Sequence, residues 1–205
     1  MGERESSGRT AACDPVTGIR LGAAFPGARG QCLEDPHDGV RVHLGCGHKP
    51  WDGWINVDQG RAAQYADVVA NVTALPFEEN FADQMVAIHL LEHFYLWEVP
   101  TLLAEWKRVL KPGGQLIVEL PSLEAVFAYL AKALEAQVED VWAQMSWWAL
   151  YGDPRYRDPA MAHKWGYTKR MLQQTLEEAG FVQVTLAPAR YHLKQRDMRA
   201  IAVKP

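Results

Sequence analysis

Cysteine is scarce in this chain of 205 residues, and it lacks the spacing that a structural role would need. The three cysteines, Cys13, Cys32 and Cys46, are an odd number and include no C-x-x-C pair. Neither a disulfide framework nor a cysteine zinc site is therefore expected. This usage predicts a reducing, cytoplasmic setting.

Long apolar runs and an excess of positive charge are also missing. No stretch reaches the roughly 18 apolar residues of a membrane-spanning helix, and the N-terminus lacks the apolar centre of a secretory signal. The formal net charge is -4, which gives no basic field to attract a polyanion. We therefore expect no membrane contact and no dedicated nucleic-acid binding.

The hydrophobic content, 48%, is enough for one sizeable core. Residues 1–39 are rich in Gly, Ser, Arg and Pro and show no period, which predicts a flexible leader. Residues 40–205 then form the single folded domain. Within it, seven segments have the alternating or continuous apolar pattern of strands: 40–46, 54–59, 67–72, 82–90, 115–121, 181–189 and 197–204.

Helical spacing fills three of the intervals between these strands. One helix is expected before Lys111, with Pro100 in its first turn. From Ser122 to about Leu150 the pattern predicts one long helix or two in series, with Ser122 as N-cap. A third helix begins after Thr168 and ends at Gly180.

Strands that alternate with helices predict an α/β fold with a doubly wound, mostly parallel, Rossmann-like sheet of seven strands. A ligand of such a sheet lies beyond the carboxyl ends of the strands, where Gly45 and His89 fall. Too few residues separate Cys46 from Trp54 for a full helical crossover. The first crossover helix should be vestigial or absent.

A glycine turn and an acid end the first two predicted strands. Gly45 and Gly47 allow positive φ and close approach of a ligand, although Pro50 replaces the third glycine of G-x-G-x-x-G. Asp58 ends the second strand, where a carboxylate can accept hydrogen bonds from ribose hydroxyls. Pro50 and the short distance to Asp58 disfavour a nicotinamide dinucleotide.

Five linked motifs carry a resemblance to a known family. They read LGCG at 44–47, GWINVD at 53–58, LPF at 75–77, HLLEH at 89–93 and LKPGG at 110–114. In order and spacing the chain resembles the class I S-adenosylmethionine-dependent methyltransferases over roughly residues 40–121. The resemblance implies S-adenosylmethionine as cofactor and methyl transfer as the activity.

The resemblance also implies the cofactor contacts. The loop of Leu44, Gly45, Cys46 and Gly47 would pass under the methionine part of the cofactor, and Asp58 would bind the ribose. Asn71 and Val72 would line the adenine; the family more often has aspartate at the position of Asn71, whose amide oxygen can accept the same bond. His89 would lie near the donor methyl group, with Leu90 packed beneath the cofactor.

The motif HLLEH also matches the H-x-x-E-H signature of inverted zinc proteases, in which both histidines lie on one helix. Here His89 closes a buried strand and His93 begins the next segment, so their rings need not converge. We therefore expect no metal. His89 is instead a candidate general base for a hydroxyl acceptor, and the alternative is a histidine that only donates or accepts structural hydrogen bonds. Glu92 and His93 are expected to be structural.

Residues 122–167 exceed what a simple crossover needs and predict a helical insertion that builds the acceptor pocket. Aromatic and cationic residues alternate there, which suits a planar or glycosidic acceptor with an anionic substituent. His163 and Tyr167 flank a glycine loop and are predicted to face the ligand, with His89, as catalytic residues. His192 is a further candidate, whereas Asp197 and Arg199 suit a solvated hairpin.

Methyl transfer to a small-molecule or sugar-containing acceptor, at oxygen, is the predicted function. Two alternatives stay open at this point. The acceptor could be a nucleic acid or a protein, which the net charge disfavours, or the fold could bind the cofactor without turnover, as a partner subunit.

Overall fold

The computed structural model describes residues 39–138 and 140–205. The predicted leader therefore falls almost entirely outside the described residues, as do Cys13 and Cys32. Cys46 is buried and is a free thiol. Burial, followed by the negative charges of Asp58 and Asp67, raises its pKa to about 12, so the thiol stays protonated.

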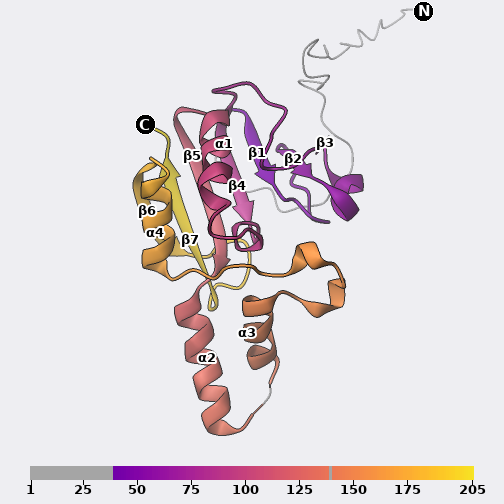
Figure 1. The fold of residues 1–205 in the computed structure, drawn as a ribbon, viewed down its shortest axis with the longest axis vertical. Helices are drawn as coiled ribbons and strands as arrows, with labels where there is room; N and C mark the ends of the chain where they lie inside the picture. The colour runs from indigo at the N-terminus through magenta and orange to yellow at the C-terminus, as the bar shows by residue number, and fades with distance from the viewer. Residues whose placement is uncertain (1–38, 139) are drawn as a thin grey trace, which may run out of the picture.

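A single seven-stranded sheet organises the fold (Figure 1). Its order is β3-β2-β1-β4-β5-β7-β6; the four pairings from β3 to β5 are parallel, and β7 runs antiparallel to both β5 and β6. The predicted fold class is confirmed, and all seven predicted strands are present. Their bounds are β1 Arg41–Leu44, β2 Ile55–Asp58, β3 Val68–Val69, β4 Ala82–Ile88, β5 Leu110–Pro121, β6 Val182–Pro188 and β7 Asp197–Val203.

The helices follow the predicted positions. They are α1 Val99–Val109, α2 Leu123–Ala136, α3 Val141–Tyr151 and α4 Lys169–Glu178, with short 3-10 helices η1 Gly60–Tyr65, η2 Leu91–His93, η3 Pro154–Tyr156 and η4 Pro159–Met161. The stretch from Ser122 is two helices in series. Ser122 caps α2 and Thr168 caps α4, as predicted, and Gly180 ends α4 with φ +82°.

The main core lies on one face of the sheet. Alternate residues of β4 and β5, such as Met85 and Leu116, pack there against Trp106 of α1 and Leu172 of α4. Helix α1 lies across β4 and β5, and α4 lies beside β6 and β7 (Figure 1). Among the described residues, both crossover helices of the domain therefore cover the same face.

Aromatic loop residues cover the opposite face. Trp54, Val86 and Ile117 form a small second cluster, with Trp51 and Tyr191 packed against it. The segment between β1 and β2 contains turns and no helix, which confirms the predicted loss of the first crossover helix.

A buried asparagine holds this helix-free crossover together. Asn56 of β2 accepts a hydrogen bond from the Trp51 N–H at 2.7 Å and donates to the carbonyl oxygens of Trp51 and Trp54. It also donates to Asp67 at 2.8 Å. The amide of one side chain thus satisfies backbone groups that a crossover helix would pair internally.

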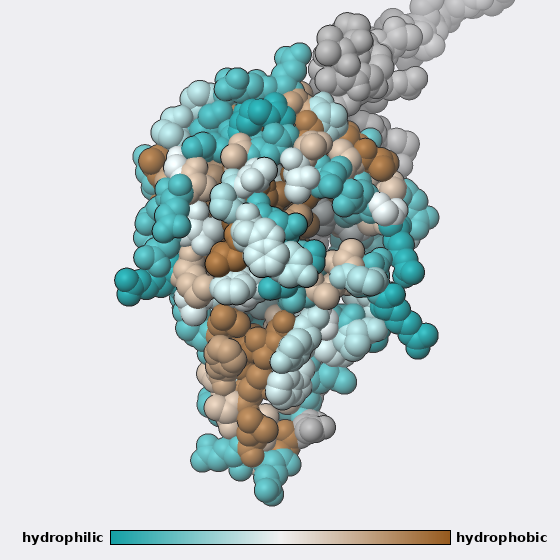
Figure 2. Space-filling view, viewed as in Figure 1, coloured by the Kyte–Doolittle hydropathy of each residue, from teal (hydrophilic) through white to brown (hydrophobic). Residues whose placement is uncertain are grey.

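Helices α2 and α3 project beyond the sheet as a hairpin (Figure 1). They share a separate small cluster of Val126, Leu130 and Ala149. Figure 2 shows apolar side chains gathered on the projecting part, where Leu134 is 70% exposed. Within residues 39–138 and 140–205, no helix combines the length and apolarity that a bilayer crossing requires.

Candidate active site

The glycine turn follows β1 directly. Gly45 and Gly47 have φ of +63° and +58°, a region that suits glycine. The backbone N–H of Gly45 donates to the Val57 carbonyl of β2 at 2.9 Å, which fixes the start of the turn. A Cβ on Gly45 would meet Leu90 at 2.8 Å, whereas a Cβ on Gly47 would meet nothing within 4 Å. The turn therefore packs on Leu90 and is open above Gly47.

Asp58, the last residue of β2, is joined to this turn. Its Oδ2 accepts from the Gly47 N–H at 2.7 Å, and its Oδ1 accepts from the Gln59 N–H at 2.6 Å. Each carboxylate oxygen has a second lone pair that remains available for a ligand hydroxyl. The adjacent strand ends thus bring together an open glycine turn and an acceptor of two hydrogen bonds.

Asn71 and Val72 lie in the turn after β3. The Asn71 side chain is exposed, and its Oδ1 accepts from the N–H and the hydroxyl of Thr73, which orders the turn. Val72 is buried, and its carbonyl accepts from the indole N–H of Trp106 at 3.0 Å. Both residues follow the carboxyl end of β3, and Val69 at that end pairs with Asp58 at the end of β2.

His89 follows β4 and adopts φ +50°, which is unusual for a residue with a side chain. Its Nε2 lies 2.9 Å from Asp197 Oδ2 and its Nδ1 lies 3.0 Å from Glu92 Oε1. Burial lowers the pKa of His89, but the hydrogen bonds and charges of Asp197 and Glu92 outweigh burial and raise the pKa to about 9. His89 is therefore an imidazolium at neutral pH. It has no free lone pair with which to act as a base, which favours the alternative reading of this residue.

Asp197 contradicts its predicted place in a solvated hairpin. It is buried and accepts hydrogen bonds from three side chains, those of His89, His192 and Arg196. Burial raises the pKa of Asp197, but these bonds outweigh it and hold the pKa well below the ordinary value. Arg199 is also buried and lies 3.7 Å from Glu119, so the prediction was wrong for both residues. The pairing of β7 with β5 carries them into the interior.

His192 lies beside His89, with ring centroids 4.4 Å apart. Its Nδ1 is 2.7 Å from Asp197 Oδ2. Because an ionised carboxylate only accepts, Nδ1 carries a proton, and the tautomer that could act as a base has its lone pair on Nε2. The side chain of His192 is 40% exposed, so this nitrogen is accessible.

The predicted ligand-facing residues His163 and Tyr167 turn inward. His163 Nδ1 contacts the Ala149 carbonyl at 2.8 Å, and its Nε2 points to Glu92 at 4.0 Å. Tyr167 is 0% exposed, and its backbone pairs with Ser122 and Leu123. The expectation that Tyr167 faces a ligand is wrong, because its ring belongs to the main core.

Glu92 is the buried acidic residue of the HLLEH segment, and it connects this segment to the insertion. Its side chain is 2% exposed, and its backbone carbonyl accepts from the N–H groups of Lys164 and Trp165. The segment after η4 is therefore bound to η2, which follows β4. His93 adds to this junction, since its ring packs edge-on against that of His163.

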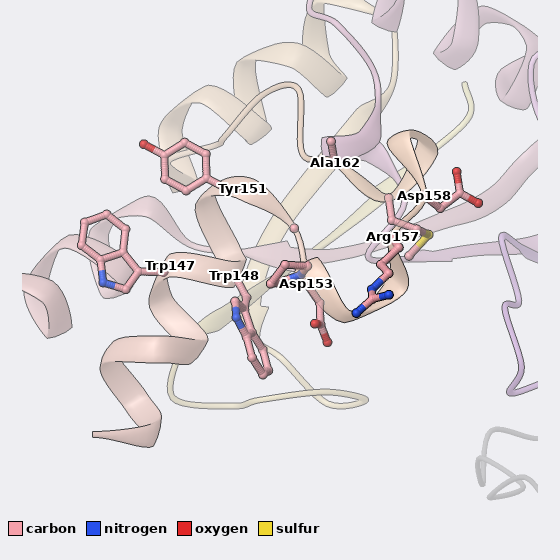
Figure 3. A pocket seen from close by; sticks show the side chains of 10 residues that line it. Trp147, Trp148, Tyr151, Asp153, Arg157, Asp158 and Ala162 are labelled. Atoms are coloured by element: carbon pink, nitrogen blue, oxygen red, sulfur yellow. The ribbon is translucent and has the colours of Figure 1, made fainter. Parts of the chain in front are cut away.

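A pocket of about 420 Å³ opens in the insertion (Figure 3). Trp147, Trp148 and Tyr151 come from α3, and the loop that follows supplies Asp153, Arg157 and Asp158. Asp153 pairs with Arg155, whose guanidinium lies 4.4 Å from the centre of the Trp148 ring. Three of the aromatic residues and one of the cationic residues of the insertion, Trp147, Trp148, Tyr151 and Arg157, thus line one pocket.

Arg61 connects this loop to the end of β2. It belongs to η1, and its guanidinium donates to the Tyr156 carbonyl at 3.2 Å and lies 3.8 Å from Asp158. Since η1 begins two residues after Asp58, the pocket loop is held on the side of the sheet where the glycine turn lies.

Residues 44–118 match the sequence model of a methyltransferase-domain family. The matched segment runs from the glycine turn to β5 and contains Asp58 and His89. Residues 44–118 thus carry a methyltransferase domain, and the sheet around them has the fold of class I S-adenosylmethionine-dependent methyltransferases. The chain is an enzyme, its cofactor is S-adenosylmethionine, and the family predicted from the five motifs is confirmed.

Solved structures share the methyltransferase fold. A methyltransferase from Thermotoga maritima, described as a possible histamine N-methyltransferase, is 16% identical with a TM-score of 0.52, covering 82% of this chain and 84% of that one. An S-adenosylmethionine-dependent methyltransferase from Archaeoglobus fulgidus is 16% identical with a TM-score of 0.55, covering 80% and 86%. Human N-acetylserotonin methyltransferase, solved with S-adenosylmethionine, is 15% identical with a TM-score of 0.51, covering 80% and 47%. No curated protein sequence matches the methyltransferase chain significantly.

The methyltransferase site includes charged residues that sequence reasoning missed. Glu92 and Asp197 are separated by 105 positions, yet both contact the His89 ring. Glu92 lies in the HLLEH motif three residues after His89, and this short spacing was a local signal that the two side chains could meet. Asp197 had none, because only the antiparallel pairing of β7 places it there.

Proposed function

We propose that the enzyme methylates a small planar or glycosidic acceptor at oxygen, and that the acceptor binds in the pocket of α3 and the following loop. The pocket supports this assignment because Trp148 and Tyr151 offer flat apolar surfaces beside polar groups. The guanidinium of Arg157 lines it without a hydrogen-bond or ion-pair partner among the described residues, whereas the pocket's Asp153 is paired with Arg155. An anionic substituent on the acceptor would suit Arg157.

The cofactor supplies an electrophilic methyl group, and the residues at the strand ends fit its parts. The open glycine turn, Leu44 to Gly47, would hold the methionine part, and Asp58 would accept from the ribose hydroxyls. Asn71 and Val72 would border the adenine, and His89 and Leu90 would border the sulfonium end. Because methyl transfer is an in-line displacement, the main contribution of these residues is orientation.

A hydroxyl acceptor also needs a base, and we assign that role to His192. Its Nδ1–H donates to the buried Asp197, which leaves Nε2 free to take a proton. The neighbouring His89 is already protonated and lies between the carboxylates of Asp197 and Glu92. His89 would therefore position the dyad and would not accept the proton itself.

The experiment that tests this function is a methyl-transfer screen with labelled S-adenosylmethionine. Phenols, glycosides and their carboxylated or phosphorylated derivatives form one set; amines, RNA, DNA and protein form the others. We expect turnover in the first set, with the label on oxygen by NMR and preference for anionic derivatives. Turnover confined to amines, nucleic acid or protein would contradict the proposal.

Two variants separate the roles within the proposed site. His192→Gln should lower kcat at least tenfold with little change in the affinity for S-adenosylhomocysteine, because proton removal contributes about 10²–10⁴-fold. Trp148→Ala should mainly raise KM for the acceptor, since it removes a stacking surface. Glu178→Ala, at an exposed residue of α4 that belongs neither to the pocket nor to the glycine turn, is the control. An unchanged kcat for His192→Gln would exclude His192 as the base.

A further inference from the structure

The buried carboxylate of Glu92 has one close charged partner among the described residues, the His89 ring, and most of its capacity to accept hydrogen bonds is unfilled. Neither Oε1 nor Oε2 accepts a hydrogen bond of good geometry from the described residues, although both atoms are buried. The nearest cationic group is His89 Nδ1, 3.0 Å from Oε1. A buried carboxylate with unfilled acceptor capacity is costly, so such a group calls for a further cation or donor.

Two histidine rings face this carboxylate with their orientation already fixed. His93 Nδ1 contacts the Ala162 carbonyl at 3.2 Å, and His163 Nδ1 contacts the Ala149 carbonyl at 2.8 Å. A carbonyl oxygen can only accept, so both Nδ1 atoms carry protons, and Nε2 is the nitrogen of each ring that can offer a lone pair to a metal. This pattern, with one nitrogen donating to a backbone carbonyl, is the usual support of metal-binding histidines.

We propose that Glu92, His93 and His163 bind a divalent transition-metal ion, with zinc as the representative case. One potential ligand atom from each of the three residues lies within 4.8 Å of the others. Tetrahedral zinc with bonds of about 2.0–2.1 Å holds its ligand atoms about 3.3 Å apart, so a contraction of about an ångström or more would complete the site. Two imidazoles and one carboxylate leave a further coordination position for water or a substrate oxygen.

A second cluster with metal-ligand chemistry provides a comparison. His89, His192 and Asp197 also lie within 4.8 Å of one another. There, however, Asp197 already accepts from Arg196, both histidines and the Leu193 N–H. A metal would have to displace a guanidinium that lies 2.6 Å from the carboxylate, so the Glu92 cluster is the favoured site.

The proposed site differs from the zinc-protease signature that the HLLEH segment resembles. His89, the first residue of that signature, lies in the second cluster, where it contacts Asp197. The third ligand of the proposed site is His163, from the insertion. A metal here would cross-link η2 to the segment that continues from the pocket residue Ala162. It would thereby fix the pocket relative to the end of β4. The proposal does not depend on the identity of the acceptor.

Titration of the metal-stripped full chain with Zn²⁺ by calorimetry tests this site. We expect one ion per chain with submicromolar Kd, and at least a hundredfold weaker binding by Glu92→Gln and by His163→Ala. His192→Ala, in the second cluster, and His48→Ala, at an exposed histidine, should bind as the unaltered chain does. Circular dichroism verifies that each variant is folded before titration.

X-ray absorption at the zinc edge of the loaded, unaltered chain gives a second measurement that needs no variant. We expect nitrogen and oxygen neighbours only, with the scattering of two imidazoles. The proposal would be overturned if the chain did not bind zinc stoichiometrically, or if binding survived both Glu92→Gln and His163→Ala. Loss of binding in His192→Ala alone, or sulfur in the coordination shell, would also overturn it.

Discussion

At the scale of single residues, Asp58 connects two parts of the cofactor site. It orders the glycine turn through the Gly47 N–H and keeps lone pairs for the ribose. We expect Asp58→Ala to weaken S-adenosylhomocysteine binding at least tenfold, because charge-assisted hydrogen bonds contribute about 1.5–3 kcal/mol each. Calorimetry measures the affinity, and the exposed Asp52→Ala is the matched control. Unchanged affinity in Asp58→Ala would remove the ribose assignment.

His89 is the residue whose role changes most between sequence and structure. Its imidazolium lies between two buried carboxylates, so its removal leaves both with fewer counter-charges. We expect His89→Ala to lower the free energy of unfolding by about 3 kcal/mol or more, measured by urea denaturation at pH 7. His48→Ala should change it by less than about 0.5 kcal/mol. A His89→Ala chain of normal stability that lacks turnover would restore the interpretation of His89 as a base.

At the scale of elements, the crossover between β1 and β2 depends on side chains in place of a helix. His43 of β1 stacks on Trp51 and contacts Asn56 Oδ1 at 3.2 Å. Burial lowers the pKa of His43 to about 4 from 6.5, although the hydrogen bond to Asn56 opposes it. The folded chain therefore holds this ring neutral.

The lowered pKa of His43 predicts that the folded chain loses stability in acid. Between pH 6.5 and 4 the unfolded chain binds a proton at His43 that the folded chain does not, so stability is complete above pH 6.5 and falls as the pH drops towards 4. The free energy of unfolding is expected to fall by about 3 kcal/mol across this range. Urea denaturation across this range should show a shallower decline for His43→Gln, which keeps a donor to Asn56 without titrating. Equal slopes for the two chains would contradict the prediction.

At the scale of the whole molecule, the sheet and the α2–α3 hairpin differ in how much apolar surface they bury. The sheet contains the main core, whereas the hairpin has a separate cluster of three buried residues and exposes Phe127 and Leu134. Hydrogen exchange followed by mass spectrometry should find the amides of α2 and α3 exchanging before those of β4 and β5. Equal protection of hairpin and sheet would show that they unfold as one unit.

The sequence by itself determined the order and type of the elements, because strand and helix periods, caps and glycines are local signals. It also determined the glycine turn, Asp58 and the family, because these motifs lie close together in the chain. The aromatic insertion was predictable from its length and composition. The choice between one helix and two after Ser122 stayed open, because helical period alone does not mark the break.

Only the tertiary structure decided which charged groups meet. His89, Glu92 and Asp197 come from separate elements, and the strand order of β4, β5 and β7 brings them together. Tyr167 and Arg199 were misassigned for the same reason, since their burial depends on neighbours distant in sequence. Protonation followed from that arrangement: an isolated histidine is mostly neutral near pH 7, but two buried carboxylates make His89 a cation.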